Sequence, residues 1–127
     1  MSVSDYRIKP SVSDKTMEEL PIIQKTYDLI KWYVPIINRL PRDYRFSLGD
    51  RLVEGLYELL DGLIDARFSS QKLKRLQQLN SHLAKLRYQT RLLFDFELLS
   101  MKRYEYASLH LRGIGTDLGG WVKQQQR

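Results

Sequence analysis

Apolar residues recur along most of the chain at alternating spacings of three and four, the period of a helix that buries one face. Four such stripes follow one another. The first contains Leu20, Ile23, Tyr27, Ile30, Val34 and Ile37. The second contains Leu48, Leu52, Leu56, Leu59, Leu63 and Ala66. The third contains Leu76, Leu79, Leu83, Leu86, Thr90 and Leu93. The fourth contains Tyr104, Ala107, Leu111, Ile114, Leu118 and Trp121. No segment shows the alternation of a strand, so the pattern predicts an all-α, antiparallel four-helix bundle with short connections.

Prolines and serines mark the expected ends of these helices. Pro35 falls inside the first stripe, and because the spacing continues to Ile37 we expect a kink there and not an end. Pro41 is expected to terminate this helix. Ser47 and Ser100 are the expected N-caps of the second and fourth helices, since a serine oxygen can accept a hydrogen bond from the first turn.

The chain divides into a tail and one domain. Residues 1–17 are mixed polar and carry no helical stripe, so we expect a mobile N-terminal tail. Residues 18–127 then form the bundle, a length that suits a single domain.

Composition narrows the function classes. The absence of cysteine excludes disulfides, thiolate metal sites and a cysteine nucleophile. No apolar run approaches the ~18–20 residues of a membrane span, and no signal pattern is visible, so we expect a cytoplasmic protein without a membrane partner. The net charge of +6 favours a polyanionic partner.

The charge is distributed unevenly among the helices. The second helix carries five carboxylates at spacings that place them on one face: Asp50, Glu54, Glu58, Asp61 and Asp65. The third helix is rich in lysine and arginine. The acidic face can pair with basic residues of the same bundle or face water, or it can meet the basic surface of a neighbouring subunit or another protein; the sequence leaves both interpretations open.

The sequence contains no recognisable set of catalytic or metal-binding residues. The two histidines, His82 and His110, lie on different helices and lack partners at metal-ligand spacing. A di-iron bundle would also need a Glu-x-x-His pair, which the chain lacks. We therefore expect no enzyme activity, no catalytic residues, no metal site and no cofactor.

Four glycines interrupt the fourth helical stripe, at Gly113, Gly115, Gly119 and Gly120. A dinucleotide-binding loop requires a strand that turns into a helix, and here the helical pattern runs through the glycines. Since each interior glycine costs a helix about 1 kcal/mol relative to alanine, we expect a packing reason for them. Gly115 and Gly119 share a face, where another helix of the bundle or of a neighbouring subunit can come close.

The connection between the first two helices is unusually basic and aromatic. Arg42 and Arg45 flank aromatic residues in the segment Leu40–Arg51, and we expect Phe46 and Leu48 to pack while the two arginines face a partner. Cations beside aromatic rings suit single-stranded RNA, which is bound through its phosphates and by base stacking. On the third helix, Arg87 and Arg91 are neighbours at i and i+4 and flank the apolar seam.

The segments 41–51, 59–67, 83–93 and 104–107, together with Ile114-Gly115 through Leu118-Gly119-Gly120-Trp121, resemble the accessory variability determinant (Avd) proteins of diversity-generating retroelements. The resemblance covers approximately residues 20–123. A related bundle family is encoded within ribosomal RNA intervening sequences, but its Ser-Ile-Pro and Ile-Ala-Glu-Gly elements are missing here.

The resemblance implies a four-helix bundle that assembles into a homopentamer with a basic surface. It further implies binding to a reverse transcriptase and its template RNA, in support of the mutagenic cDNA synthesis that diversifies a target gene, without catalytic activity. By position in the family, Arg87 and Arg91 are the first residues to carry over, and Lys25 matches a basic position less closely. The alternative is a generic RNA-binding or structural bundle of the ribosomal intervening-sequence type that has no polymerase partner.

Overall fold

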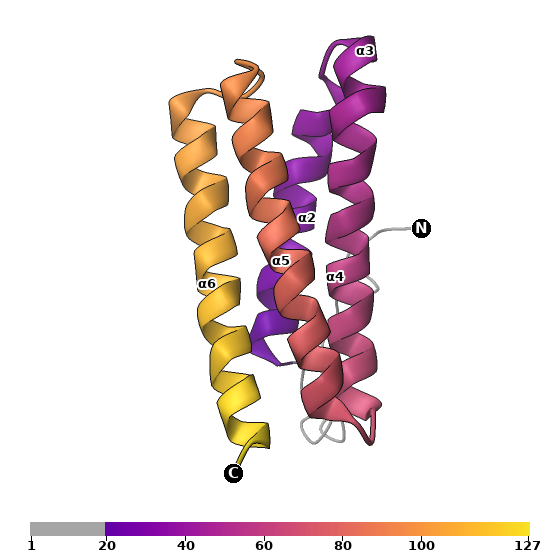
Figure 1. Cartoon of the computed structure of the whole chain (residues 1–127). Coiled ribbons are helices and arrows are strands. Elements are labelled where there is room, and N and C mark those ends of the chain that lie inside the picture. The colour runs from indigo at the N-terminus through magenta and orange to yellow at the C-terminus, as the bar shows by residue number, and fades with distance from the viewer. Residues whose placement is uncertain (1–19) are drawn as a thin grey trace, which may run out of the picture.

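Four long helices run up and down in antiparallel order and form the bundle that the sequence predicts (Figure 1). The computed structural model describes residues 20–127, so the tail predicted for residues 1–17 lies outside the described residues. The long helices are α2 (Pro21–Asn38), α4 (Asp50–Phe68), α5 (Lys72–Asp95) and α6 (Met101–Gln125). Helix α4 packs between α2 and α5, and α6 closes the bundle against α5 and α2. The described part of the chain contains no strand, which confirms the all-α fold class.

The predicted stripes of the second, third and fourth helices form most of the core. Every residue of the third stripe is buried. In the second and fourth stripes the inner positions are buried, while Leu48, Tyr104 and Trp121 at the ends are partly exposed. Apolar burial of this extent is the main favourable contribution to the stability of a bundle.

The stripe predicted for the first helix is only partly right. Tyr27 is 43% exposed and does not face the core, and Val34 is half-buried and packs only at the edge of the core. Thr26, Leu29 and Tyr33 are buried in their place. Helix α2 contacts both α4 and α6. Its buried face is therefore wider than the single row of residues that a 3-4 spacing selects.

Tyr33 brings a polar group into this core. Its hydroxyl lies 2.9 Å from the Thr90 hydroxyl of α5, and both side chains are buried. The pair explains why a threonine occupies an otherwise leucine-rich stripe. Burial raises the pKa of the Tyr33 phenol above its ordinary value of 10.0, so Tyr33 stays neutral and keeps this hydrogen bond across the physiological range.

The connection between α2 and α4 differs from the predicted loop. Helix α2 continues through Pro35 to Asn38, and a short helix α3 (Arg42–Tyr44) then leads through a π-helical turn η2 (Arg45–Gly49) directly into α4. The prediction that Ser47 is an N-cap is therefore wrong. Its hydroxyl instead donates a hydrogen bond to the Asp43 carbonyl oxygen at 2.9 Å, because helical backbone already precedes it.

The N-cap predicted for the fourth helix is confirmed. Ser100 has extended backbone angles, and its hydroxyl accepts a hydrogen bond from the Arg103 backbone N–H at 3.2 Å. This bond satisfies one of the free donors in the first turn of α6.

Candidate nucleic-acid interface

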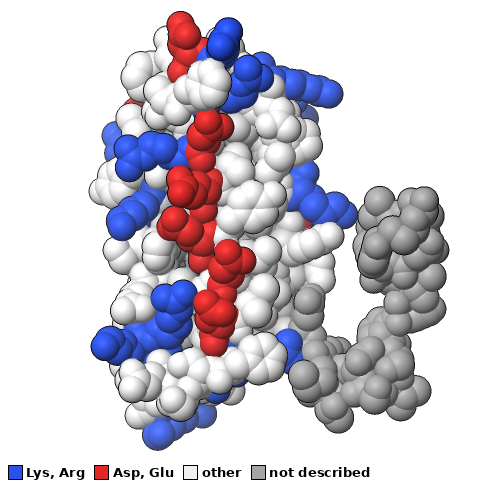
Figure 2. Space-filling view, turned by 90° about the vertical axis from the view of Figure 1, so that its right-hand side faces the viewer, with Lys and Arg blue, Asp and Glu red and all other residues white. Residues whose placement is uncertain are grey.

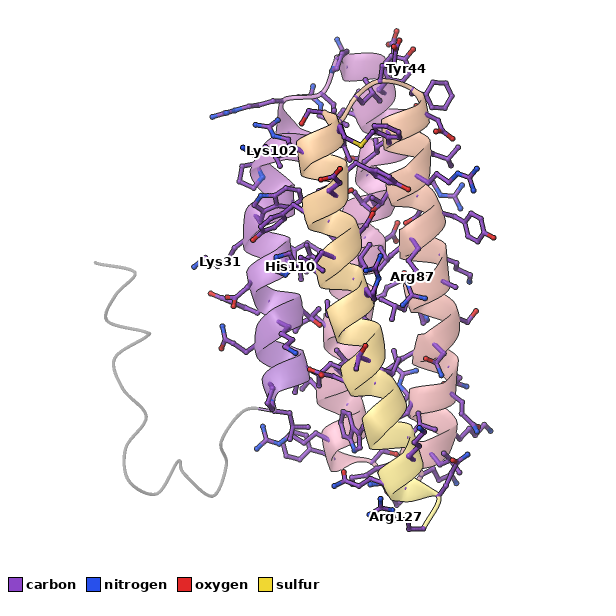
Figure 3. The ribbon with its side chains drawn as sticks, turned by 90° about the vertical axis from the view of Figure 1, so that its left-hand side faces the viewer. Lys31, Tyr44, Arg87, Lys102, His110 and Arg127 are labelled. Carbon is purple, nitrogen blue, oxygen red and sulfur yellow. The ribbon has the colours of Figure 1, made fainter. Side chains whose placement is uncertain are left out.

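A groove of about 600 Å³ runs between α5 and α6 and gathers basic and aromatic side chains. It is lined by Ala84, Arg87, Tyr88, Arg91, Tyr104, Ser108, Leu111 and Arg112. Figure 3 shows Arg87 on the α5 side of α6, whereas Lys31 and His110 lie on the α2 side. Two consecutive helices therefore build this surface together.

The helical period explains why the arginines meet at this groove. On α5, Leu83, Leu86 and Thr90 point into the core, and the i, i+4 pair Arg87 and Arg91 lies on the adjacent face. On α6, Arg112 follows the buried Leu111 and supplies the third guanidinium. All three arginines are exposed.

The groove is strongly positive because its lining contains three arginines and no carboxylate. Arg91 has an acidic partner next to the groove in Asp95, whose Oδ2 lies 3.8 Å from Nε of Arg91, with both side chains well exposed. An exposed ion pair this long holds little free energy. A phosphate can therefore compete for Arg91 at small cost.

Two tyrosines add stacking surfaces to the groove. Tyr88 is 68% exposed, which leaves its ring open to a base. Tyr104 is fixed by the ring of Phe94, with centroids 4.4 Å apart and an angle of 13° between the planes. Guanidinium forks match phosphate oxygens, and exposed rings stack on unpaired bases, so the groove has the chemistry of a single-stranded nucleic-acid site.

The arginines predicted in the first connection do not join this groove. Arg42 and Arg45 lie at one end of the bundle, where their guanidinium carbons stand 5.8 and 5.9 Å from the centre of the Phe46 ring. Arg45 also donates a hydrogen bond from Nη1 to the Asn38 carbonyl oxygen at 3.2 Å. The prediction that Phe46 packs is wrong, because its side chain is 59% exposed.

Lys25 lies on the other side of α6. Its Nζ is 2.8 Å from Oδ2 of Asp117, in an ion pair that joins α2 to α6. The structure therefore brings Arg87 and Arg91 together and leaves Arg42, Arg45 and Lys25 at separate places.

Sequence reasoning missed Arg112 and placed Tyr104 only in the core stripe. Ser108 and Arg112 stand at i and i+4 beside the buried positions of α6, as Arg87 and Arg91 do on α5. This spacing is visible in the sequence. It indicates a shared groove only once it is known which faces of α5 and α6 lie next to each other.

The five predicted carboxylates of α4 form a continuous acidic band, which Figure 2 shows as a red stripe down one face. All five are exposed. Asp65 lies 3.5 Å from Arg75 of α5, and Glu58 lies 3.5 Å from Nδ1 of His82. Pairing within the bundle thus accounts for at least these two carboxylates, and the band repels nucleic acid from this side.

Neither a metal site nor a membrane span emerges from residues 20–127. No group of three or more potential metal ligands comes together in this range. Likewise, none of its helices combines the length and apolar character that crossing a membrane requires.

Comparison with known proteins identifies a family for the bundle. No curated protein matches the sequence. The family model described as bAvd-like matches residues 20–125, which is the whole bundle to within two residues of its C-terminus. The resemblance to Avd proteins is thereby confirmed, and the chain belongs to the bAvd-like family.

Proposed function

We propose that this protein is a non-catalytic accessory subunit of a diversity-generating retroelement. In this role it binds the element's reverse transcriptase and template RNA and supports mutagenic cDNA synthesis. Membership of the bAvd-like family supports the assignment. The arginine groove between α5 and α6 is the observation that carries it, because its lining joins three guanidiniums to two aromatic rings without a carboxylate.

The proposal divides the surface between two roles. The groove provides phosphate and base contacts, whereas the acidic band of α4 faces away from RNA because of its charge. Arg42 and Arg45, at the end of the bundle, remain candidates for the reverse transcriptase, since Arg42 and the Phe46 ring form an exposed cation–aromatic patch there.

We further propose that the working form is a homo-oligomer, which the resemblance gives as a pentamer. Three large apolar side chains are exposed along one face of α4, at spacings of seven and four: Tyr57 at 48%, Ile64 at 40% and Phe68 at 66%. A row of exposed apolar groups on one face is typical of surfaces that subunits or partners cover. Mass measurement of the purified protein by light scattering, without RNA, tests this part of the proposal.

The functional test is reverse transcription of the template RNA with the partner enzyme and the Arg87→Ala/Arg91→Ala variant. We expect a loss of cDNA of roughly tenfold or more, because two charge-assisted contacts are removed. The matched control is Lys74→Ala/Lys85→Ala, which removes the same charge from the same helix at residues that do not line the groove.

Equal cDNA yields from the two variants would contradict the assignment of the groove. A wild-type protein that binds RNA but has no effect on the reverse transcriptase would favour the alternative, a generic RNA-binding bundle of the ribosomal intervening-sequence type.

A further inference from the structure

The four glycines of α6 have different surroundings, although the sequence presents them as one cluster. A methyl group placed on Gly113, Gly119 or Gly120 would meet nothing within 4 Å. A methyl group on Gly115 would overlap the Nη2 atom of Arg87 and lie 3.2 Å from Cδ2 of Leu83. Packing within the chain therefore explains Gly115 alone.

The atom next to Gly115 is the end of a functional side chain. The guanidinium of Arg87 crosses from α5 and rests on the α6 backbone, in the space that any other residue at position 115 would fill. The missing side chain thus gives the Arg87 guanidinium a packing position on α6, and Arg87 itself lines the groove together with Arg91 and Arg112.

This packing position matters because two effects favour movement of the Arg87 side chain out of the groove. The three guanidiniums repel one another, and a long exposed side chain gains rotamer freedom when it extends into water. A side chain that is already held in its bound position loses less freedom when a ligand arrives, which raises affinity without a new contact.

We propose that Gly115 is a positioning residue, which holds the Arg87 guanidinium in the groove for contact with an RNA phosphate. This inference rests on the proposed function for its ligand, and on the packing of Arg87 against α6 for its geometry. It also explains why a residue with low helix propensity occupies position 115, an explanation that does not apply to the three other glycines of α6.

The test compares Gly115→Ala with Gly113→Ala, a matched change on the same helix. Gly113→Ala should raise the melting temperature by roughly 2–5 °C, because alanine is the better helix former and nothing opposes its methyl group. It should leave RNA affinity unchanged. Gly115→Ala should keep the fold, since the atom displaced is the end of a flexible side chain, but weaken binding of a single-stranded template RNA by roughly two- to tenfold.

Two further measurements separate positioning from a general structural effect. In an Arg87→Ala background, Gly115→Ala should have no effect on RNA affinity, since the group it displaces is gone. In NMR spectra of the protein without RNA, the Nε–H signal of Arg87 should shift in Gly115→Ala and stay in place in Gly113→Ala.

An unchanged Arg87 signal, or an equal loss of affinity with and without Arg87, would overturn the positioning role. If the Arg87 signal shifts while the wild-type protein binds no RNA, the proposed function fails, and the assignment of RNA as the ligand of Arg87 fails with it. A Gly115→Ala variant that binds RNA as tightly as the wild type would also overturn the proposal.

Discussion

At the scale of single residues, the core contains a polar pair that the hydrophobic pattern did not reveal. Thr90 was predicted as a buried member of the third stripe, and that is confirmed. Its partner Tyr33 was not in the predicted stripe of α2, because a 3-4 spacing that begins at Leu20 skips position 33. A spacing rule identifies the buried face of a helix from its apolar residues. The burial of Tyr33 depends in addition on a hydrogen-bond partner, the Thr90 hydroxyl, on another helix.

This pair should behave as a unit. Tyr33→Phe or Thr90→Val alone should lower the free energy of unfolding by about 1–2 kcal/mol, because each leaves a buried hydroxyl without its partner. The double variant should lose less than the sum of the two single losses, since no unpaired hydroxyl remains. Urea denaturation of the four proteins measures the coupling. Strictly additive losses would mean that the two hydroxyls do not depend on each other.

At the scale of elements, the sequence patterns predicted the positions of the helices more accurately than the residues at which the helices begin. Leucine spacing identified the inner faces of α4 and α5 because each packs along most of its length on neighbouring helices. The start of α4 was misplaced because helical backbone begins upstream, at Arg42, and passes through the π-helical turn η2. A serine followed by an apolar helical stripe is the same local signal at Ser47 and at Ser100. Only the preceding backbone decides which of them is a cap.

The two serines therefore make a matched pair. Ser100→Ala should cost about 1 kcal/mol of unfolding free energy, because the first turn of α6 loses its capping oxygen. Ser47→Ala should change stability by less than about 0.5 kcal/mol, since the Ser47 hydroxyl only returns a hydrogen bond to a carbonyl one turn earlier. Thermal or urea unfolding of both variants provides the comparison. Equal costs would show that Ser47 also acts as a cap.

At the scale of the whole molecule, charge is sorted onto different sides of the bundle. The acidic band lies along α4, and the arginine groove lies between α5 and α6. The sequence predicted the band and two of the three arginines, because each set repeats along one helix. It did not predict that Arg112 joins them, or that Lys25 and Arg45 are occupied elsewhere by Asp117 and by the Asn38 carbonyl. Those relations depend on which helices are neighbours.

The central claim is that this groove, and not the net charge of +6, binds RNA. The most direct test is the affinity for single-stranded template RNA, measured by fluorescence anisotropy over a range of salt concentrations. Arg87→Ala/Arg91→Ala is compared with Lys74→Ala/Lys85→Ala, which carries the same net charge.

We predict that the arginine variant binds roughly 30- to 100-fold more weakly at moderate salt. The slope of log affinity against log salt concentration should decrease by the amount expected for the loss of about two phosphate contacts. The lysine variant should lose less than about threefold. Equal losses in the two variants, with the same change in salt dependence, would contradict the account, because total charge and not the groove between α5 and α6 would then determine binding.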